Sequence, residues 1–189
     1  MDSATIARVA EYYRNAQHTP NHPSYQSFIR ETLAQWDALV AHGWRFSLVS
    51  GLTPGPETYA DSNAMFQDIA RKQLRVDTAG QDFAPGHPLA NVVYGSVWHG
   101  EYWTANEVFR AVHDVNGHGT SLCPFETFQG ELEAIRNHSR MYSVESWPAL
   151  FGETFGQLCH YLAGYGFVKI QRAVVLPMEL INLALPEEL

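Results

Sequence analysis

Apolar side chains recur every three or four residues over most of the chain, which is the period of a helix that buries one face. The segments with this period are 3–16, 24–42, a helix that begins at 61–63, the run before His113, 125–142 and 150–162. Ser3, Ser24 and either Thr104 or Asn106 stand where an N-cap is needed, because their side-chain oxygens accept a bond from a free amide of the first turn.

Shorter segments alternate between apolar and polar positions, as half-buried strands do. These segments are 44–50, 74–76, 92–98 and 167–176. Glycine and proline in 51–56 and 77–90 predict turns and loops between them. Since the helical segments dominate, we expect an α+β fold that is predominantly helical and has a small sheet.

The length of 189 residues suits a single domain. We expect one domain over residues 1–189, built from an N-terminal helical scaffold or arm (1–58), a core that carries the chemistry (59–176) and a C-terminal tail (177–189).

Polar side chains interrupt two of the apolar helices along one face. Glu153, Gln157 and His160 lie at i, i+4 and i+7 in a segment that is otherwise almost entirely apolar or small. Glu131 and His138 share the inner side of the preceding helix in the same way. A polar stripe on so apolar a helix points into a site more often than to solvent. Glu131 and His138 either pair with each other or meet a metal or a substrate.

Two histidines, His113 and His118, lie five positions apart at the end of a helix. On a straight α-helix their side chains would point well apart, so we expect Gly117 to bend the backbone and bring them together. Imidazole is the commonest metal-ligand side chain. The spacing differs from the zinc-protease pattern, and Asp114 follows the first histidine in place of Glu. We interpret the pair as metal ligands.

Two imidazoles and one carboxylate on one face of a metal form the facial triad of non-heme Fe(II) oxygenases. Glu153 is the expected third ligand, because its helix offers it no evident cationic partner. Zinc with the same ligands would instead activate water for hydrolysis, with Glu131 or Asp114 as general base. If Glu131 and His138 also bind, the site would be dinuclear.

The segment from His113 to His118 resembles the iron-binding motif of the biopterin-dependent aromatic amino acid hydroxylases, with Asp114 in place of their Glu. The segment that begins at Glu153 resembles the one holding that family's iron-binding glutamate. The His-Gly element at His99 also has a counterpart there. The resemblance covers roughly residues 98–160 and implies His113, His118 and Glu153 as the triad. The family's pterin-binding loop is not found, so pterin is not a predicted cofactor.

A second resemblance is to a set of uncharacterised phage and bacterial proteins. It rests on Phe109–Asp114 with Gly117-His118, Gly130-Glu131, His138–Ser143, and Glu153-Thr154 with Gly156-Gln157. The resemblance implies that Glu131, His138 and Gln157 belong to the site, and it implies no particular reaction.

The charge and the cysteines exclude some classes of protein. The formal net charge is −8 and the basic residues do not cluster, so we expect no nucleic-acid partner. The first residues lack a signal-peptide pattern and no apolar run reaches membrane-spanning length, so we expect a cytoplasmic protein without a membrane partner. Two cysteines, Cys123 and Cys159, do not make a disulfide framework and are read as thiols.

These observations predict a non-heme Fe(II)-dependent monooxygenase that uses dioxygen and acts on a small, possibly aromatic molecule. We expect His138, Glu131, Gln157 and His160 to orient ligands or hold the substrate. The expected pocket wall consists of aromatic residues close to the motif: Trp98, His99, Tyr102 and Trp103. The alternatives are a zinc-dependent hydrolase and a non-catalytic, metal-stabilised accessory protein.

Overall fold

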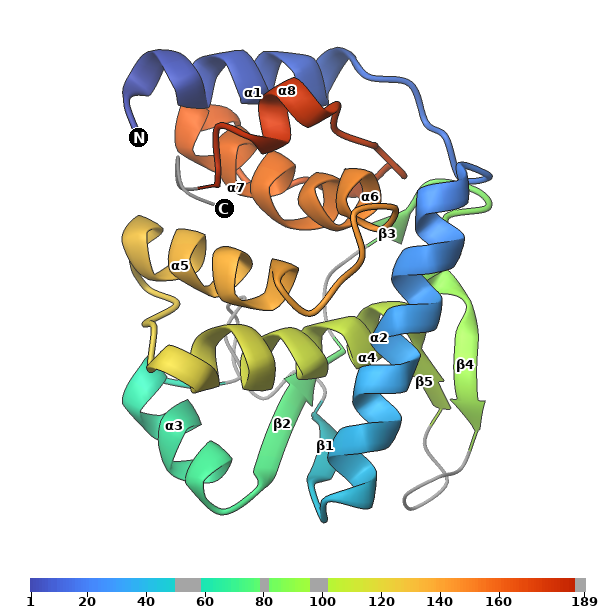
Figure 1. The fold of residues 1–189 in the computed structure, drawn as a ribbon, viewed down its shortest axis with the longest axis vertical. Coiled ribbons are helices and arrows are strands. Elements are labelled where there is room, and N and C mark those ends of the chain that lie inside the picture. The colour runs from blue at the N-terminus through green and yellow to red at the C-terminus, as the bar shows by residue number, and fades with distance from the viewer. Residues whose placement is uncertain (50–58, 79–81, 96–101, 186–189) are drawn as a thin grey trace. The chain divides into compact units, whose positions relative to one another are not determined.

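A computed structural model describes residues 1–49, 59–78, 82–95 and 102–185 (Figure 1). The chain forms two compact units, each made of segments that are not contiguous in sequence. Unit 1 comprises Met1–Phe28, Gln81–Pro88 and Ser139–Leu189, and unit 2 comprises Ile29–Gly80 and Leu89–His138. This division does not decide how many domains the chain has, so the single domain stays a prediction.

Unit 1 is built mainly from helices of the two ends of the chain. Its elements are α1 (Ser3–Asn15), the start of α2 (Pro23–Ala41), β3 (Asp82–Phe83), α6 (Trp147–Phe151), η3 (Gly152–Gly156), α7 (Gln157–His160), η4 (Tyr161–Tyr165), β6 (Ile170–Gln171) and α8 (Met178–Ile181). Helix α1 packs along α7 (Figure 1). Strand β3 pairs with β6 in parallel. The stretch from α6 to η4 forms one nearly continuous helical run in which two π-helical segments, η3 and η4, alternate with α-helix.

Unit 2 combines helices with two small sheets. Its elements are the rest of α2, β1 (Arg45–Val49), α3 (Ser62–Ala70), β2 (Gln73–Asp77), β4 (Val92–Gly95), β5 (Tyr102–Thr104), α4 (Ala105–His113), η2 (Asp114–Gly119) and α5 (Phe128–Ser139). A short 3-10 turn, η1 (Pro88–Ala90), comes directly before β4. Strands β1 and β2 are parallel, whereas β4 and β5 are antiparallel. Helix α4 packs against β2 (Figure 1).

The core of unit 2 is aromatic at its centre. Trp36 stacks on Phe46 with ring centroids 4.3 Å apart and lies 4.9 Å from Trp103. Offset and edge contacts of this kind add to the free energy that the buried apolar area already supplies. The same core buries Val108 and Val112 of α4, so it holds the helix that leads into the predicted metal motif.

Helix α4 begins at a capping box. The hydroxyl of Thr104 accepts a bond from the backbone N–H of Glu107, and the Glu107 carboxylate accepts one from the backbone N–H of Thr104. This reciprocal pair fixes the first turn, and the apolar face then sets the rotation of the helix about its axis. The position of His113 at the last residue of α4 follows from both.

The structure confirms an α+β fold that is mostly helical, with three two-stranded sheets among the described residues where one small sheet was expected. Thr104 is the N-cap of α4, as predicted. For α1 the prediction of Ser3 is wrong, because the Asp2 carboxylate caps the helix by accepting from the N–H of Thr5. The predicted strand over 167–176 is limited to Ile170–Gln171.

No helix in the described part of the chain has the length and apolar character needed to cross a membrane. Both cysteines, Cys123 and Cys159, are buried free thiols.

Candidate metal centre

His113 and His118 face each other because the helix changes its period between them. Helix α4 continues directly into η2, a π-helix in which each turn closes by i→i+5 hydrogen bonds. Residues five apart therefore lie on the same face, and the two imidazole rings meet edge to face with centroids 5.2 Å apart. The predicted bend at Gly117 is wrong, since helical backbone runs through η2 and Gly117 has no left-handed φ.

Gly117 has a different role, which is to let two chain segments approach closely. A Cβ at this position would lie 2.9 Å from the carbonyl oxygen of Ala134 and 3.2 Å from Cε1 of His113. Helix α5 can therefore pass next to η2 only because residue 117 has no side chain.

Helix α5 brings the third candidate ligand, Glu131. Its Oε1 lies 3.6 Å from Nε2 of His118, and one ligand atom from each of His113, His118 and Glu131 lies within 4.8 Å of the others. Ligand atoms about 2.1 Å from one metal ion are separated by roughly 3.0–3.4 Å, so a small closure of these side chains would suffice. The two nitrogen donors and one carboxylate suit a first-row transition metal.

The backbone of Cys123 contacts both the imidazole and the backbone carbonyl of His118. The imidazole Nδ1 lies 2.7 Å from the carbonyl oxygen of Cys123, and the backbone N–H of Cys123 donates to the carbonyl of His118 at 3.0 Å. A carbonyl oxygen only accepts, so Nδ1 of His118 carries the proton and Nε2 has the free lone pair. This is the usual arrangement of a metal-ligating histidine, and it aims Nε2 at Glu131.

His113 is backed by a second histidine. Its Nδ1 lies 3.0 Å from Nδ1 of His138, whose Nε2 lies 3.1 Å from Oε1 of Gln35. That same oxygen accepts a bond from Nδ2 of Asn116 at 2.9 Å. The Phe109 ring stacks on His138 with centroids 5.9 Å apart and an interplanar angle of 12°.

Burial keeps both members of this histidine pair neutral. Desolvation and the neighbouring histidines hold the pKa of His113 well below its usual range. Desolvation, with a smaller effect of His118, lowers the pKa of His138 to about 3. Neutral imidazole is the form that binds metals. Next to them, burial raises the pKa of Asp114 to about 7, and Arg110 opposes this shift.

Glu153 belongs to unit 1 and has partners of its own there. Its Oε1 accepts a short hydrogen bond from the Tyr25 hydroxyl and lies 3.3 Å from Nε2 of His87, while its Oε2 accepts from Nε2 of Gln157 at 3.0 Å. The expectation that Glu153 has no partner apart from a metal is therefore wrong. Its role as a metal ligand stays a prediction.

Gln157 and His160 are the first and last residues of α7, which follows the π-helical segment η3 that carries Glu153. Nδ1 of His160 lies 3.1 Å from the carbonyl oxygen of Gly166, and its ring meets that of Tyr13 with centroids 5.7 Å apart. The catalytic roles predicted for Gln157 and His160 stay predictions.

The four residues expected to line a pocket fall in different surroundings. Trp98 and His99 lie outside the described residues. Trp103 is fully buried in the core of unit 2, and Tyr102 is 70% exposed on β5. Their role in a pocket stays a prediction.

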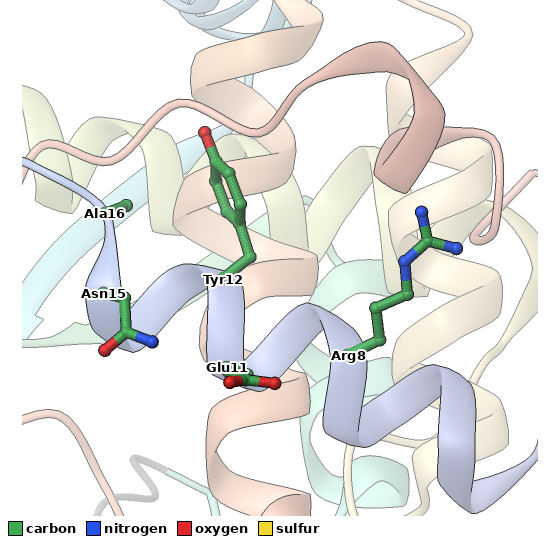
Figure 2. A pocket seen from close by; sticks show the side chains of 5 residues that line it. All are labelled: Arg8, Glu11, Tyr12, Asn15 and Ala16. Atoms are coloured by element: carbon green, nitrogen blue, oxygen red, sulfur yellow. The ribbon is translucent and has the colours of Figure 1, made fainter.

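Two hollows in the surface lie away from these residues. One, of about 360 Å³, is lined by residues of α1 and its C-terminal cap, and Figure 2 shows Arg8 and Tyr12 extending from the same side of the helix one turn apart. The other, of about 450 Å³, lies over β1 and β2 and includes Arg45 and Arg75. Neither is lined by a predicted site residue.

Sequence reasoning missed Gln35, Asn116 and the carbonyl of Cys123. A signal for Gln35 was available, because Phe28, Thr32, Gln35 and Leu39 follow the same i, i+4, i+7, i+11 line along α2. Two polar residues on an otherwise apolar line mark a buried hydrogen-bonding position. A backbone carbonyl such as that of Cys123 leaves no mark in the sequence.

No protein-family model matches this chain, and no curated protein or solved structure is significantly similar to it. The resemblance to aromatic amino acid hydroxylases therefore rests on the motif residues alone.

Proposed function

We propose that unit 2 binds a divalent first-row transition metal through Nε2 of His113, Nε2 of His118 and one carboxylate oxygen of Glu131. We further propose that the protein is a non-heme Fe(II) oxygenase acting on a small molecule. The observation that carries the first proposal is the convergence of one ligand atom from each of these three residues within 4.8 Å.

The donor set supports iron. Two neutral imidazoles and one carboxylate on one side of an ion leave coordination positions open on the other side. Fe(II) held in this way by His113, His118 and Glu131 would supply the chemistry for activating dioxygen beside a substrate. His113 and Glu131 are only partly buried, which is compatible with access to those positions, whereas His118 is 2% exposed and anchored.

The surrounding residues have separate tasks in this proposal. The Cys123 carbonyl and His138 orient the two ligand imidazoles, and Gly117 allows Glu131 to come close. Glu131 lies in the first turn of α5, where the helix dipole interacts favourably with a negative charge. Each of these groups acts before any substrate arrives, so the ligand geometry is preorganised.

A zinc-dependent hydrolase is the second candidate, because two histidines and one glutamate are also the ligands of catalytic zinc in metalloproteases. Metal analysis of protein purified without air separates the two. Bound or readily bound Fe(II), with oxygen consumption on addition of a substrate library, supports the oxygenase. Tightly held zinc together with failure to take up iron favours the hydrolase. A fourth protein ligand that closes the shell would favour a non-catalytic accessory protein.

Replacing each of two glutamates by alanine tests which carboxylate binds. We expect Glu131→Ala to lose most of the bound metal, because it removes the anionic ligand next to His118. We expect Glu153→Ala to retain metal and to lose stability, because it removes the carboxylate that accepts from the Tyr25 hydroxyl and from the Gln157 amide in unit 1. The measurement is the metal-to-protein ratio after anaerobic purification.

The control is Glu133→Ala, on the same helix as Glu131 and paired with Arg136 at 3.7 Å. It should keep the metal ratio of the unchanged protein. Metal loss in Glu153→Ala with retention in Glu131→Ala would instead establish the triad first predicted from the sequence. Equal loss in both would indicate a site that uses both carboxylates.

A further inference from the structure

We propose that Gln35 is a positioning residue that fixes the tautomer of His113 across two hydrogen bonds, so that the metal-binding lone pair lies on Nε2. The inference rests on the proposed metal site of unit 2. It adds the residue that determines which ring nitrogen of His113 is free to bind the metal. Gln35 comes from α2, far in the sequence from His113, and the chain of bonds described above reaches His113 through His138.

The first step is the direction of the bond at Gln35. Its Oε1 receives the side-chain N–H of Asn116 at 2.9 Å and lies 3.1 Å from Nε2 of His138. An amide oxygen has only lone pairs to offer. Nε2 of His138 must therefore carry a proton and donate it to Gln35.

The second step is the direction of the hydrogen bond between His138 and His113. His138 is fully buried among other histidines, so it is neutral and holds a single ring proton. Since that proton is on Nε2, the Nδ1 of His138 is an acceptor. The Nδ1 of His113, 3.0 Å away, must then be the donor. The remaining nitrogen of His113, Nε2, keeps its lone pair.

The position of Asn116 ties this chain to the π-helix. Asn116 lies in η2 between the two ligand histidines, and its amide donates to the same Gln35 oxygen that directs His138. The oxygen is thus held in place by the element that carries His118. A donor at position 35 would reverse both bonds and put the proton of His113 on Nε2, where it blocks metal binding.

Three substitutions at position 35 test this directly. Gln35→Glu keeps an acceptor, Gln35→Leu removes it, and Gln35→Lys supplies a donor. We expect a zinc dissociation constant within about threefold of the unchanged protein for Glu, weaker by about 10–100-fold for Leu, and weakest for Lys. Gln26→Leu, an exposed position on the same helix, is the matched control and should leave zinc affinity unchanged.

The decisive readout is the nitrogen-15 NMR spectrum of the metal-free full chain, which distinguishes the two neutral tautomers. We expect His113 to be the Nδ1–H form in the unchanged protein and in Gln35→Glu, and the Nε2–H form in Gln35→Lys. An Nε2–H form in the unchanged protein would overturn the inference, as would unchanged zinc affinity in both Gln35→Leu and Gln35→Lys. If the unchanged protein binds no metal, the proposed function fails, while the NMR result still decides the tautomer.

Discussion

At the scale of single residues, Gly117 is a position where one added methyl group would disturb the candidate metal centre directly. In Gly117→Ala the new Cβ would press on the Ala134 carbonyl at 2.9 Å and on the His113 ring, and neither α5 nor the ring can yield without moving the ligands. We expect a loss of roughly 1–3 kcal/mol in the free energy of unfolding, with weaker metal binding. Urea denaturation and a zinc titration measure the two effects.

The neighbouring Gly119 provides the comparison. A Cβ there would meet Cδ1 of Ile69 at 3.2 Å, and a flexible side-chain end can move aside. Gly119→Ala should therefore change stability and zinc affinity less than Gly117→Ala. The close approach of α5 to η2 would lose its significance if the two variants behaved alike.

At the scale of elements, the π-helix η2 is what makes a five-residue spacing work. Deleting Asn116 would return the segment to an α-helical period, in which residues 113 and 118 become four apart and lie on one face with an offset of about 40°. We expect the deletion to weaken metal binding, because this offset turns the His118 imidazole relative to Glu131 and to the Cys123 carbonyl that anchors it.

Asn116→Ala distinguishes the effect of the π-helical register of η2 from the effect of the Asn116–Gln35 hydrogen bond. It keeps η2 intact and removes only the bond to Gln35, so we expect metal to bind with affinity reduced by at most about 10-fold. Metal ratios and far-UV circular dichroism on both variants are the measurement. Normal metal binding by the deletion variant would mean that the π-helical register is dispensable.

The sequence predicted those elements whose signals are local. Thr104 and Glu107 indicate the start of α4, and the apolar stripe of this helix indicates which of its sides is buried. The histidine pair was also identifiable, because few other residue types bind metals so often. The shift to a π-helical period was not, since the residue types within η2 do not distinguish i→i+5 turns from i→i+4 turns.

The third ligand was harder to choose for a physical reason. Glu131 and Glu153 both lie on apolar helices, and sequence spacing does not tell which histidines each one faces. The structure pairs Glu153 with Tyr25 and Gln157 in unit 1 and brings Glu131 to His118 in unit 2. Contacts between residues far apart in sequence decided this, as they decided the place of Gln35.

At the scale of the whole molecule, metal should stabilise unit 2 specifically. Four tryptophans fall in its segments: Trp36, Trp44, Trp98 and Trp103. Trp147 falls in unit 1, so Trp147→Phe makes fluorescence report on unit 2 alone. We expect zinc at 100 times its dissociation constant to add about 2.7 kcal/mol to the free energy of unfolding seen by this probe. Excess chelator should remove the gain, and no gain would contradict metal binding by unit 2.

Alkaline pH should weaken the folded state. Burial raises the pKa of the Cys159 thiol to about 12 and that of the Tyr59 phenol to about 12. A group with a higher pKa in the folded state favours folding below its unfolded pKa, and this contribution is lost as pH rises through the folded value. We expect the urea midpoint to fall steadily from about pH 9 to about pH 12.

Cys159→Ala checks the assignment. Without the thiol, the fall in the urea midpoint should be shallower where an unfolded cysteine ionises first, near pH 9. An identical pH profile in the variant would show that other groups govern alkaline unfolding.

The interleaving of the two units has a consequence for the order in which the chain is made. Unit 2 is complete once residue 138 has been synthesised, whereas unit 1 joins the first residues to the last. During synthesis, α1 therefore cannot pack against α7 until α7 has been made. Until then, the face of α1 that includes Val9 and Tyr13 is exposed to water. The candidate metal site of unit 2 can form while the protein is still attached to the ribosome, and the apolar face of α1 stays accessible to chaperones and proteases until α7 has been made.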